Sequence, residues 1–281
     1  MRLLLLVALA MTAFAANSVL NRAALTDGGT DPIAFGVLRL IAGAGVLVPL
    51  AWLRGGRLHL RGGRRLLGVA ALLVYVFGFS TAYLRLDTGL GALILFGFVQ
   101  ITMFGGALSL REPVPPLRWV GAAIAFGGLI WLLWPGSGGN VPLLAGLAMA
   151  AAGAAWGVYS LAGRGGGDPL AGTAAQFLLA SIVALMVGAA LALWPQSGVL
   201  RMTVEGAALA TISGCVTSGL GYALWYRVLP HLAASSAGAA QLSVPILAMI
   251  GGAALLGEPL TRDFAVAACL VLGGVALSLR R

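Results

Sequence analysis

The sequence carries very little charge. Of its 281 residues only 9% are charged and 60% are hydrophobic, and lysine is absent, so all 17 basic residues are Arg. A soluble domain contains about 25% charged residues. Because too few polar side chains are present to cover a globule in water, we expect the chain to lie mostly in a lipid bilayer. The net charge of +9 does not indicate nucleic-acid binding, because the Arg residues lie between apolar stretches rather than on one basic face with aromatic platforms.

Reactive side chains are equally scarce. The two cysteines, Cys215 and Cys269, lie inside apolar stretches and are interpreted as packing residues rather than a disulfide or metal site. No Asp, Glu or His falls in the middle of an apolar stretch, so the membrane carboxylate that a proton-coupled carrier usually keeps is not visible. No phosphate loop, HExxH pattern or nucleophile motif occurs. We therefore expect no enzyme, no cofactor and no metal.

Long apolar runs dominate what is present. A membrane-spanning helix needs about 20 mainly apolar residues, and clusters of Gly, Pro and Arg separate ten such stretches. Because the connections are short, consecutive helices should be antiparallel. The predicted spans are 3–21, 32–53, 66–85, 89–110, 116–134, 142–161, 170–194, 205–228, 232–256 and 262–279.

The first 16 residues resemble a cleavable signal peptide. However, Leu9-Ala10-Met11 recurs as Leu147-Ala148-Met149 at the matching place in the second half of the chain. A segment with an internal counterpart is expected to belong to the fold, so we interpret it as the first helix.

An internal repeat organises the chain. Residues 103–133 align without a gap on residues 249–279 at an offset of 146, and each copy is an apolar helix, a Glu-Pro corner and a second apolar helix with a Gly-Gly pair. Asp31-Pro32 and Asp168-Pro169 open equivalent spans. The repeat predicts two five-helix units, 3–133 and 142–279, joined by a linker at 134–141.

The distribution of Arg predicts the orientation of these units. With the N-terminus in the cytoplasm, twelve Arg residues fall inside, four fall outside, and Arg39 lies within a span. Cytoplasmic loops are enriched in Arg and Lys, so both termini are expected to be cytoplasmic. Because five is odd, the second unit starts on the opposite side of the membrane, and the two units are inverted repeats. Such repeats let one midplane site face either side in turn.

These features resemble the EamA-like branch of the drug/metabolite transporter superfamily. The resemblance covers about 3–133 and 142–279 and rests on ten helices, two five-helix repeats and the paired Glu-Pro corners at Glu112-Pro113 and Glu258-Pro259. It implies an all-α inner-membrane carrier, often an exporter of amino acids or related metabolites, with a central cavity lined by helices 1, 3, 4, 6, 8 and 9. The first corner departs from the pattern, because Arg111 stands where the second has Gly257.

Polar side chains inside a bilayer are costly and are therefore candidate functional residues. Asn17 and Asn21 share one face of the first span. At a rise of 1.5 Å per residue, Asn17 lies roughly 21 Å from the inner side and Arg39 roughly 10 Å from the outer side. In a core about 30 Å thick these depths match, so we predict that the two residues are neighbours. Arg39 either anchors a substrate carboxylate or plays a structural part, capping loop carbonyls or pairing with Asp31 or Asp87.

Further candidates lie on later spans. Pro245 is predicted to bend the ninth span. Gln100 either lines the cavity or links helices through hydrogen bonds. The aromatic residues of the sixth and eighth spans either line the pocket or pack between helices. The remaining candidates for substrate binding are Trp156, Tyr159, Tyr222, Trp225, Gln241 and Ser243.

The Glu-Pro corners are interpreted as structural. Proline is tolerated at the start of a helix because the N–H group that it lacks would have no partner within the helix there. Glutamate is favourable beside a helix N-terminus. The Gly-Gly pairs allow close helix contact.

The expected function is alternating-access transport of a small polar or amphipathic metabolite, most simply an exported amino acid. A multidrug exporter is the alternative within transport, and a non-transporting scaffold or receptor the alternative outside it. The expected partners are a small-molecule substrate and the bilayer, with no nucleic acid, and a homodimer is left open.

Overall fold

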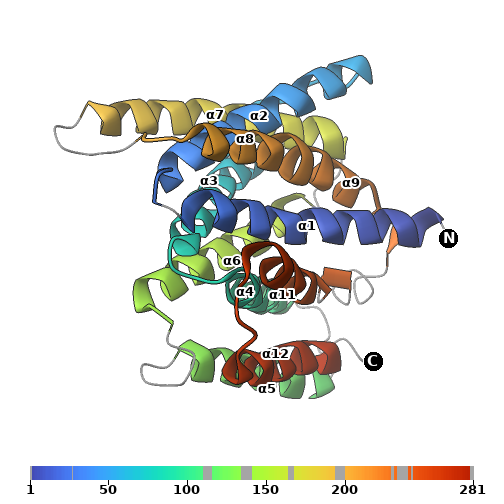
Figure 1. Cartoon of the computed structure of the whole chain (residues 1–281). Coiled ribbons are helices and arrows are strands. Elements are labelled where there is room, and N and C mark those ends of the chain that lie inside the picture. The colour runs from blue at the N-terminus through green and yellow to red at the C-terminus, as the bar shows by residue number, and fades with distance from the viewer. Residues whose placement is uncertain are drawn as a thin grey trace.

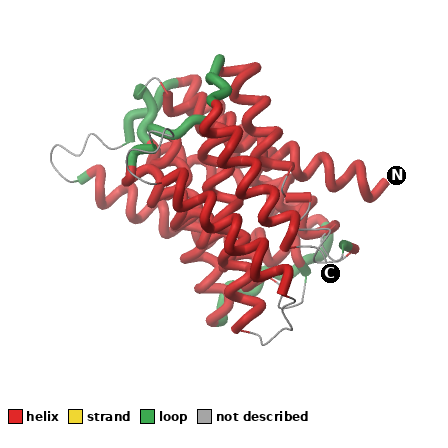
Figure 2. The backbone as a smooth tube through the Cα atoms, turned by 90° about the horizontal axis from the view of Figure 1, so that it is seen from below, coloured by secondary structure: helices red, strands yellow, loops and turns green. Residues whose placement is uncertain are grey.

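The computed structural model describes residues 2–26, 28–109, 116–133, 141–163, 168–193, 200–228, 231–232, 240–241 and 243–278. Within these residues the regular structure is helical (Figures 1 and 2). Seven helices are long and apolar enough to cross a membrane, and three shorter apolar helices accompany them. The predicted all-α membrane fold is confirmed.

A described helix overlaps each predicted span. The helices of the first half are α1 (Arg2–Thr26), α2 (Pro32–Leu53), α3 (Gly63–Tyr83), α4 (Thr88–Ser109) and α5 (Pro116–Leu133). Those of the second half are α6 (Leu143–Gly163), α7 (Pro169–Ala192), the continuous run of α8 (Val204–Ile212), η1 (Ser213–Leu220) and α9 (Gly221–Val228), then α11 (Ser243–Leu256) and α12 (Arg262–Ser278).

Three differences from the predicted spans stand out. The eighth span contains an eight-residue π-helix, η1, which the sequence did not predict. The ninth span was predicted from 232, but α11 begins at Ser243, with 240–241 also helical. The Glu112-Pro113 corner and most of the predicted linker lie outside the described residues.

The repeated Asp-Pro pair starts the equivalent helices α2 and α7. Asp31 Oδ1 accepts hydrogen bonds from the backbone N–H groups of Ile33 at 2.8 Å and Ala34 at 3.1 Å. Asp168 Oδ1 accepts from Leu170 N at 3.0 Å. In each helix proline follows at the first position, where its missing N–H has no intrahelical partner to lose. Asp31 is therefore occupied as a helix cap.

The most extensive helix contacts run between the two halves. α1 contacts η1, α9 and α11 of the second half, and α6 contacts α3 and α4 of the first. The equivalent helices α2 and α7 pack on each other, as do α4 with α11 and α5 with α12. In Figure 1 the α5–α12 pair lies at the bottom and α2, α7 and α8 at the top, with α1 between them. Because each half inserts its first helix into the other, the centre of the molecule is built from both.

Candidate functional site

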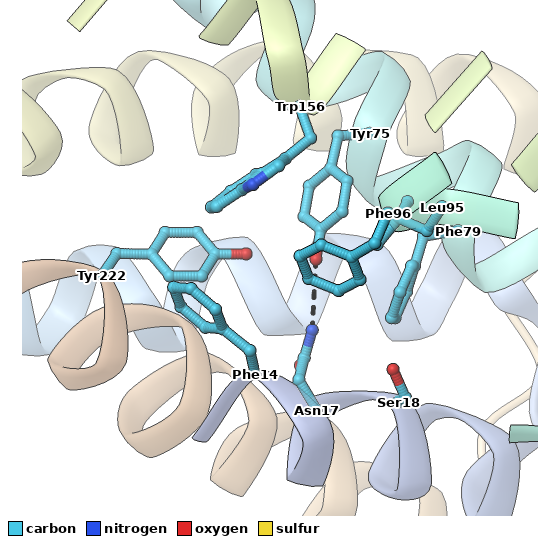
Figure 3. Close-up of a pocket in the computed structure, with 9 residues that line it drawn as sticks. All are labelled: Phe14, Asn17, Ser18, Tyr75, Phe79, Leu95, Phe96, Trp156 and Tyr222. Carbon is cyan, nitrogen blue, oxygen red and sulfur yellow. Dashed lines mark hydrogen bonds between the residues drawn. The ribbon is translucent and has the colours of Figure 1, made fainter. Parts of the chain in front are cut away.

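An enclosed pocket lies at this centre, where both halves supply its walls. Figure 3 shows the lining side chains converging from different helices. The first half contributes α1, α3 and α4, and the second half contributes α6 and α9. The lining residues are Phe14, Asn17, Ser18, Tyr75, Phe79, Leu95, Phe96, Trp156 and Tyr222.

The pocket is closed in this structure. The space left among its side chains has room for little more than one water molecule. Its rings pack on one another, with Phe14 set edge-on to Trp156 and Tyr222 at centroid distances of 5.8 Å. Trp156 lies 4.7 Å from the Tyr222 ring. A solute larger than water can therefore enter only when the helices separate.

Asn17 is the centre of a buried polar network. Its Oδ1 accepts a hydrogen bond from Ser213 Oγ at 2.6 Å and lies 3.0 Å from Thr217 Oγ1, both on η1. Its Nδ2 donates to the Tyr75 hydroxyl at 3.3 Å, the dashed line of Figure 3. Asn21 extends the network, donating to Asn17 O at 3.0 Å and accepting from Ser80 Oγ at 2.9 Å. The network joins α1 to both α3 and η1.

Arg39 is fully buried behind the pocket wall. Its Nε donates to Ser218 Oγ at 2.9 Å. Its Nη2 donates to the hydroxyls of Tyr75 at 3.3 Å and Tyr222 at 3.1 Å, whereas its buried Nη1 has no hydrogen-bond partner among the described residues. The guanidinium carbon also lies 5.2 Å from the Tyr75 ring centroid and 5.3 Å from that of Phe79. Buried charges are normally paired, so this arrangement is unusual.

The structural alternative for Arg39 that invoked Asp31 or Asp87 is wrong. Asp31 caps α2, and Asp87 pairs with Arg22 at 3.4 Å. The predicted neighbourhood of Asn17 and Arg39 is confirmed, since both donate to the Tyr75 hydroxyl. The estimate of matched depth succeeded because helix rise per residue is nearly constant.

The π-helix η1 brings its hydroxyls to these two residues. Ser213 and Thr217 face Asn17, and Ser218 faces Arg39. Gly214 makes this close approach feasible, because a Cβ there would collide with the Arg39 carbonyl oxygen on α2. Short π-helical segments occur frequently at functional sites, and here the segment positions the polar wall of the pocket.

The predicted site residues fall into three groups. Asn17, Trp156 and Tyr222 line the pocket. Asn21 and Arg39 are one hydrogen bond behind it. Tyr159 stacks on Trp156 at 5.5 Å and Trp225 packs edge-on to Phe14 at 5.9 Å, so both support lining rings.

The other predicted residues are not among those that line the pocket. Gln100 is half-buried on α4. Gln241 has a buried Oε1 without a partner, and Ser243 donates to the Ala240 carbonyl at 2.6 Å. Pro245 is the third residue of α11, where the missing proline N–H falls in the first turn of the helix.

Sequence reasoning missed most of the lining residues, namely Phe14, Ser18, Tyr75, Phe79, Leu95 and Phe96. A signal was present on α3, where Tyr75, Phe79 and Tyr83 recur at intervals of four residues and form one helical stripe. Phe14 and Phe96 stand alone among apolar neighbours, and nothing in their local sequence distinguishes them.

A cluster of charged residues lies one turn beyond the pocket on α1. Arg22 Nε is 3.3 Å from Glu258 Oε1, its Nη2 is 3.4 Å from Asp87 Oδ1, and its Nη1 donates to Tyr83 O at 2.9 Å. Glu258 Oε2 also accepts from Thr88 N at 2.8 Å. Glu258 therefore caps α4 rather than its own following helix α12, and the cluster joins the two halves.

The backbone conformation of the second Glu-Pro corner accounts for the glycine that precedes it. Gly257 has φ +66°, in the left-handed region that side chains disfavour.

Among the residues that the structure describes, no group of three His, Cys, Asp or Glu side chains could hold a metal ion.

A closed pocket lined by aromatic and hydrogen-bonding side chains from both halves lies at the centre of a bundle of apolar helices. The fold and this site define the class of multi-pass membrane carriers.

Comparisons with known proteins identify the family. The model of the EamA-like transporter family matches residues 1–134 and again 143–280. An uncharacterized protein of Pseudomonas aeruginosa, PA1977, is 49% identical over 99% of this chain and 94% of its own length. The threonine/homoserine exporter RhtA of Salmonella typhimurium is 30% identical over 88% of this chain and 83% of its own length. The chain belongs to the EamA-like transporter family and is a transporter, not an enzyme.

A solved crystal structure supports the fold. It matches with a TM-score of 0.70 at 19% identity and covers 97% of both chains.

Proposed function

We propose that this protein is an inner-membrane carrier that exports a small metabolite, such as an amino acid or a related solute, by alternating access. The observation that carries the proposal is the closed central pocket built from both halves, with the buried Arg39 and Asn17 at its polar wall. Similarity to a threonine/homoserine exporter supports a metabolite of this kind. In this proposal both termini are cytoplasmic, in agreement with the distribution of Arg.

The Arg22 cluster is the outer closure in this proposal. Arg22 lies one turn from Ser18 of the pocket and ties α1 to Asp87 before α4 and to Glu258 before α12. On the inner side only one member of this cluster recurs in the sequence, since Glu112 is the counterpart of Glu258. The repeat aligns Arg22 with Ser160, at the offset of 138 that relates Leu9 to Leu147, and aligns Asp87 with Ala233 at the offset of 146. Inverted repeats alone would predict equal closures, so the charges favour a carrier whose outer side is held more firmly.

The aromatic wall favours a second candidate, export of amphipathic drugs. Six of the lining residues are aromatic, namely Phe14, Tyr75, Phe79, Phe96, Trp156 and Tyr222. Such rings bind flat apolar molecules and also attract cations. Arg39 opposes this candidate for cationic drugs, since it places a positive charge directly behind the wall.

Solute flux into proteoliposomes tests the proposal. Purified protein is reconstituted, and uptake of labelled L-threonine, L-homoserine, L-leucine and L-phenylalanine is compared with that of empty liposomes. We expect saturable flux of at least one amino acid. Ser18→Leu should abolish it by filling the pocket, whereas Thr211→Leu, at an exposed position on α8, should not. Flux of cationic drugs alone would support the second candidate. If neither amino acids nor cationic drugs were transported, the result would favour a non-transporting scaffold or receptor.

A further inference from the structure

Two tyrosine hydroxyls meet at the centre of the pocket. Figure 3 shows the hydroxyl of Tyr75, from α3, and that of Tyr222, from α9, both turned towards the interior. The two residues come from different halves of the molecule. What these hydroxyls can offer to a solute depends on which of their hydrogen-bonding positions the protein already occupies.

The protein occupies acceptor positions of both hydroxyls. A phenol oxygen has two lone pairs and one proton. The Tyr75 oxygen accepts from Asn17 Nδ2 and from Arg39 Nη2, each at 3.3 Å, so both of its lone pairs are used. The Tyr222 oxygen accepts from the same Arg39 nitrogen at 3.1 Å. Within the described residues the only partner to which either hydroxyl can donate is the other hydroxyl, so at least one of the two protons remains to be offered to a solute.

The charge beside the pocket also favours a negatively charged solute. Arg39 is fully buried, retains an unpartnered Nη1, and has no carboxylate in contact. No Asp or Glu lines the pocket. Asp31 caps α2, and Asp87 and Glu258 pair with Arg22. A guanidinium stays charged at every physiological pH, so a positive charge lies beside the pocket, and the part of the chain that the structure describes places no counter-charge in contact with it.

We propose that the pocket selects solutes by a carboxylate group, which accepts hydrogen bonds from the Tyr75 and Tyr222 hydroxyls. Arg39 lies behind these hydroxyls, fixes both oxygens as acceptors and supplies the opposite charge. The inference rests on the proposed transport function and gives its substrate class, an organic acid or zwitterion whose apolar part packs on the surrounding rings. Cationic amphiphiles are rejected, because their charge would be buried beside a guanidinium.

Binding of matched acids and amides to the purified full-length protein tests this inference. The probes are L-phenylalanine, L-leucine, L-threonine and 3-phenylpropionate, each beside its primary amide, together with 2-phenylethylamine. We expect at least one acid to bind at least about tenfold more tightly than its amide, because hydrogen bonds to a charged group are the stronger ones. The amine should not bind at millimolar concentration.

Conservative substitutions test whether the two tyrosine hydroxyls bind the carboxylate. Tyr75→Phe and Tyr222→Phe keep the rings and remove only the hydroxyls, and each should weaken binding of the acid by about ten- to a hundredfold. The amides should be affected much less. Tyr226→Phe is the control, because Tyr226 lies on α9 and is not among the residues that line the pocket. It should retain wild-type affinity.

The outcomes separate this inference from the transport proposal. Amides or the amine binding as tightly as the acids, unchanged acid binding in both Tyr variants, or no binding of any acid at millimolar concentration would each overturn carboxylate selection. Flux of neutral or cationic solutes without preference for acids would overturn it while leaving transport intact. Acid binding that depends on both hydroxyls, but without any flux, would support the inference and contradict the transport function.

Discussion

At the scale of single residues, the polar wall depends on Asn17. This side chain ties α1 to both η1 and α3. Thr217 has a second acceptor at Ser213 O, 2.9 Å away, whereas within the described residues the Ser213 hydroxyl has only Asn17 as a partner. Loss of the amide therefore leaves buried polar groups unsatisfied.

We predict that Asn17→Ala lowers the free energy of unfolding by about 1–3 kcal/mol, the usual cost of a buried polar group left without its partner. Thermal unfolding in detergent, followed by tryptophan fluorescence, measures the change. Thr211→Ala serves as control, because this exposed hydroxyl bonds only to its own helix at Ala207 O. Equal melting temperatures for the two variants would contradict the importance of the network.

At the scale of helices, the contact between η1 and α2 requires glycine at one position. A methyl group at Gly214 would meet the Arg39 carbonyl oxygen and the Ala42 side chain. By contrast, a Cβ at Gly45 on α2 would have no neighbour within 4 Å. Gly214 lies on the π-helix η1 and Gly45 on the α-helix α2, and the space available to a methyl group differs between them.

We predict that Gly214→Ala destabilises the protein by about 1–3 kcal/mol through overpacking and displaces the hydroxyls of η1 from Arg39. Gly45→Ala should be neutral or stabilising by up to about 1 kcal/mol, because alanine has the higher helix propensity. Thermal unfolding compares the two. A Gly214→Ala protein as stable as wild type would show that η1 and α2 are not closely apposed.

The Arg22 cluster is the second contact at this scale. Arg22→Gln removes both ion pairs, so the proposed outer closure should open more often. A reporter cysteine at Ser18, with Cys215 and Cys269 replaced by Ala, should then react several-fold faster with a membrane-impermeant reagent added from outside. The control Arg85→Gln changes an exposed Arg of the α3–α4 loop, which also carries Asp87, and should leave the rate unchanged. Equal rates of cysteine modification in the two variants would show that Arg22 does not hold the outer side closed.

At the scale of the whole molecule, the packing exchanges helices between the halves. α1 packs on the third and fourth helices of the second half, and α6 on those of the first. Neither half can therefore bury its first helix without the other, and the pocket exists only in the assembled pair. The exchange follows from duplication, since each copy provides the same surface.

Membrane orientation belongs to this scale as well. We predict that both termini are cytoplasmic, because twelve Arg residues fall on that side and four on the other. A reporter active only in the periplasm, fused after Arg281, should give little signal, whereas insertion of the same reporter in the α3–α4 loop after Arg85 should give a strong one. The reverse pattern in correctly inserted protein would invert the topology.

The sequence by itself determined the elements of this protein. Bilayer thickness fixes how long an apolar run must be, so nearly every span lies close to its described helix. Asp-Pro pairs mark the starts of α2 and α7 because capping is a local interaction. Constant helix rise also placed Asn17 beside Arg39, and the match of the two halves followed directly from identical residues at a fixed offset.

Only the tertiary structure decided which side chains face the pocket. Tyr75, Phe79 and Phe14 look like ordinary apolar packing in the sequence, and their role depends on helices from the other half. Gln100, by contrast, is conspicuously polar and is not among the lining residues. In a membrane helix every face is apolar, so periodicity does not separate lipid-facing from pocket-facing positions. Rotation of each helix, and the π-helical turn that carries Ser213, Thr217 and Ser218 to Arg39 and Asn17, are set by contacts between helices.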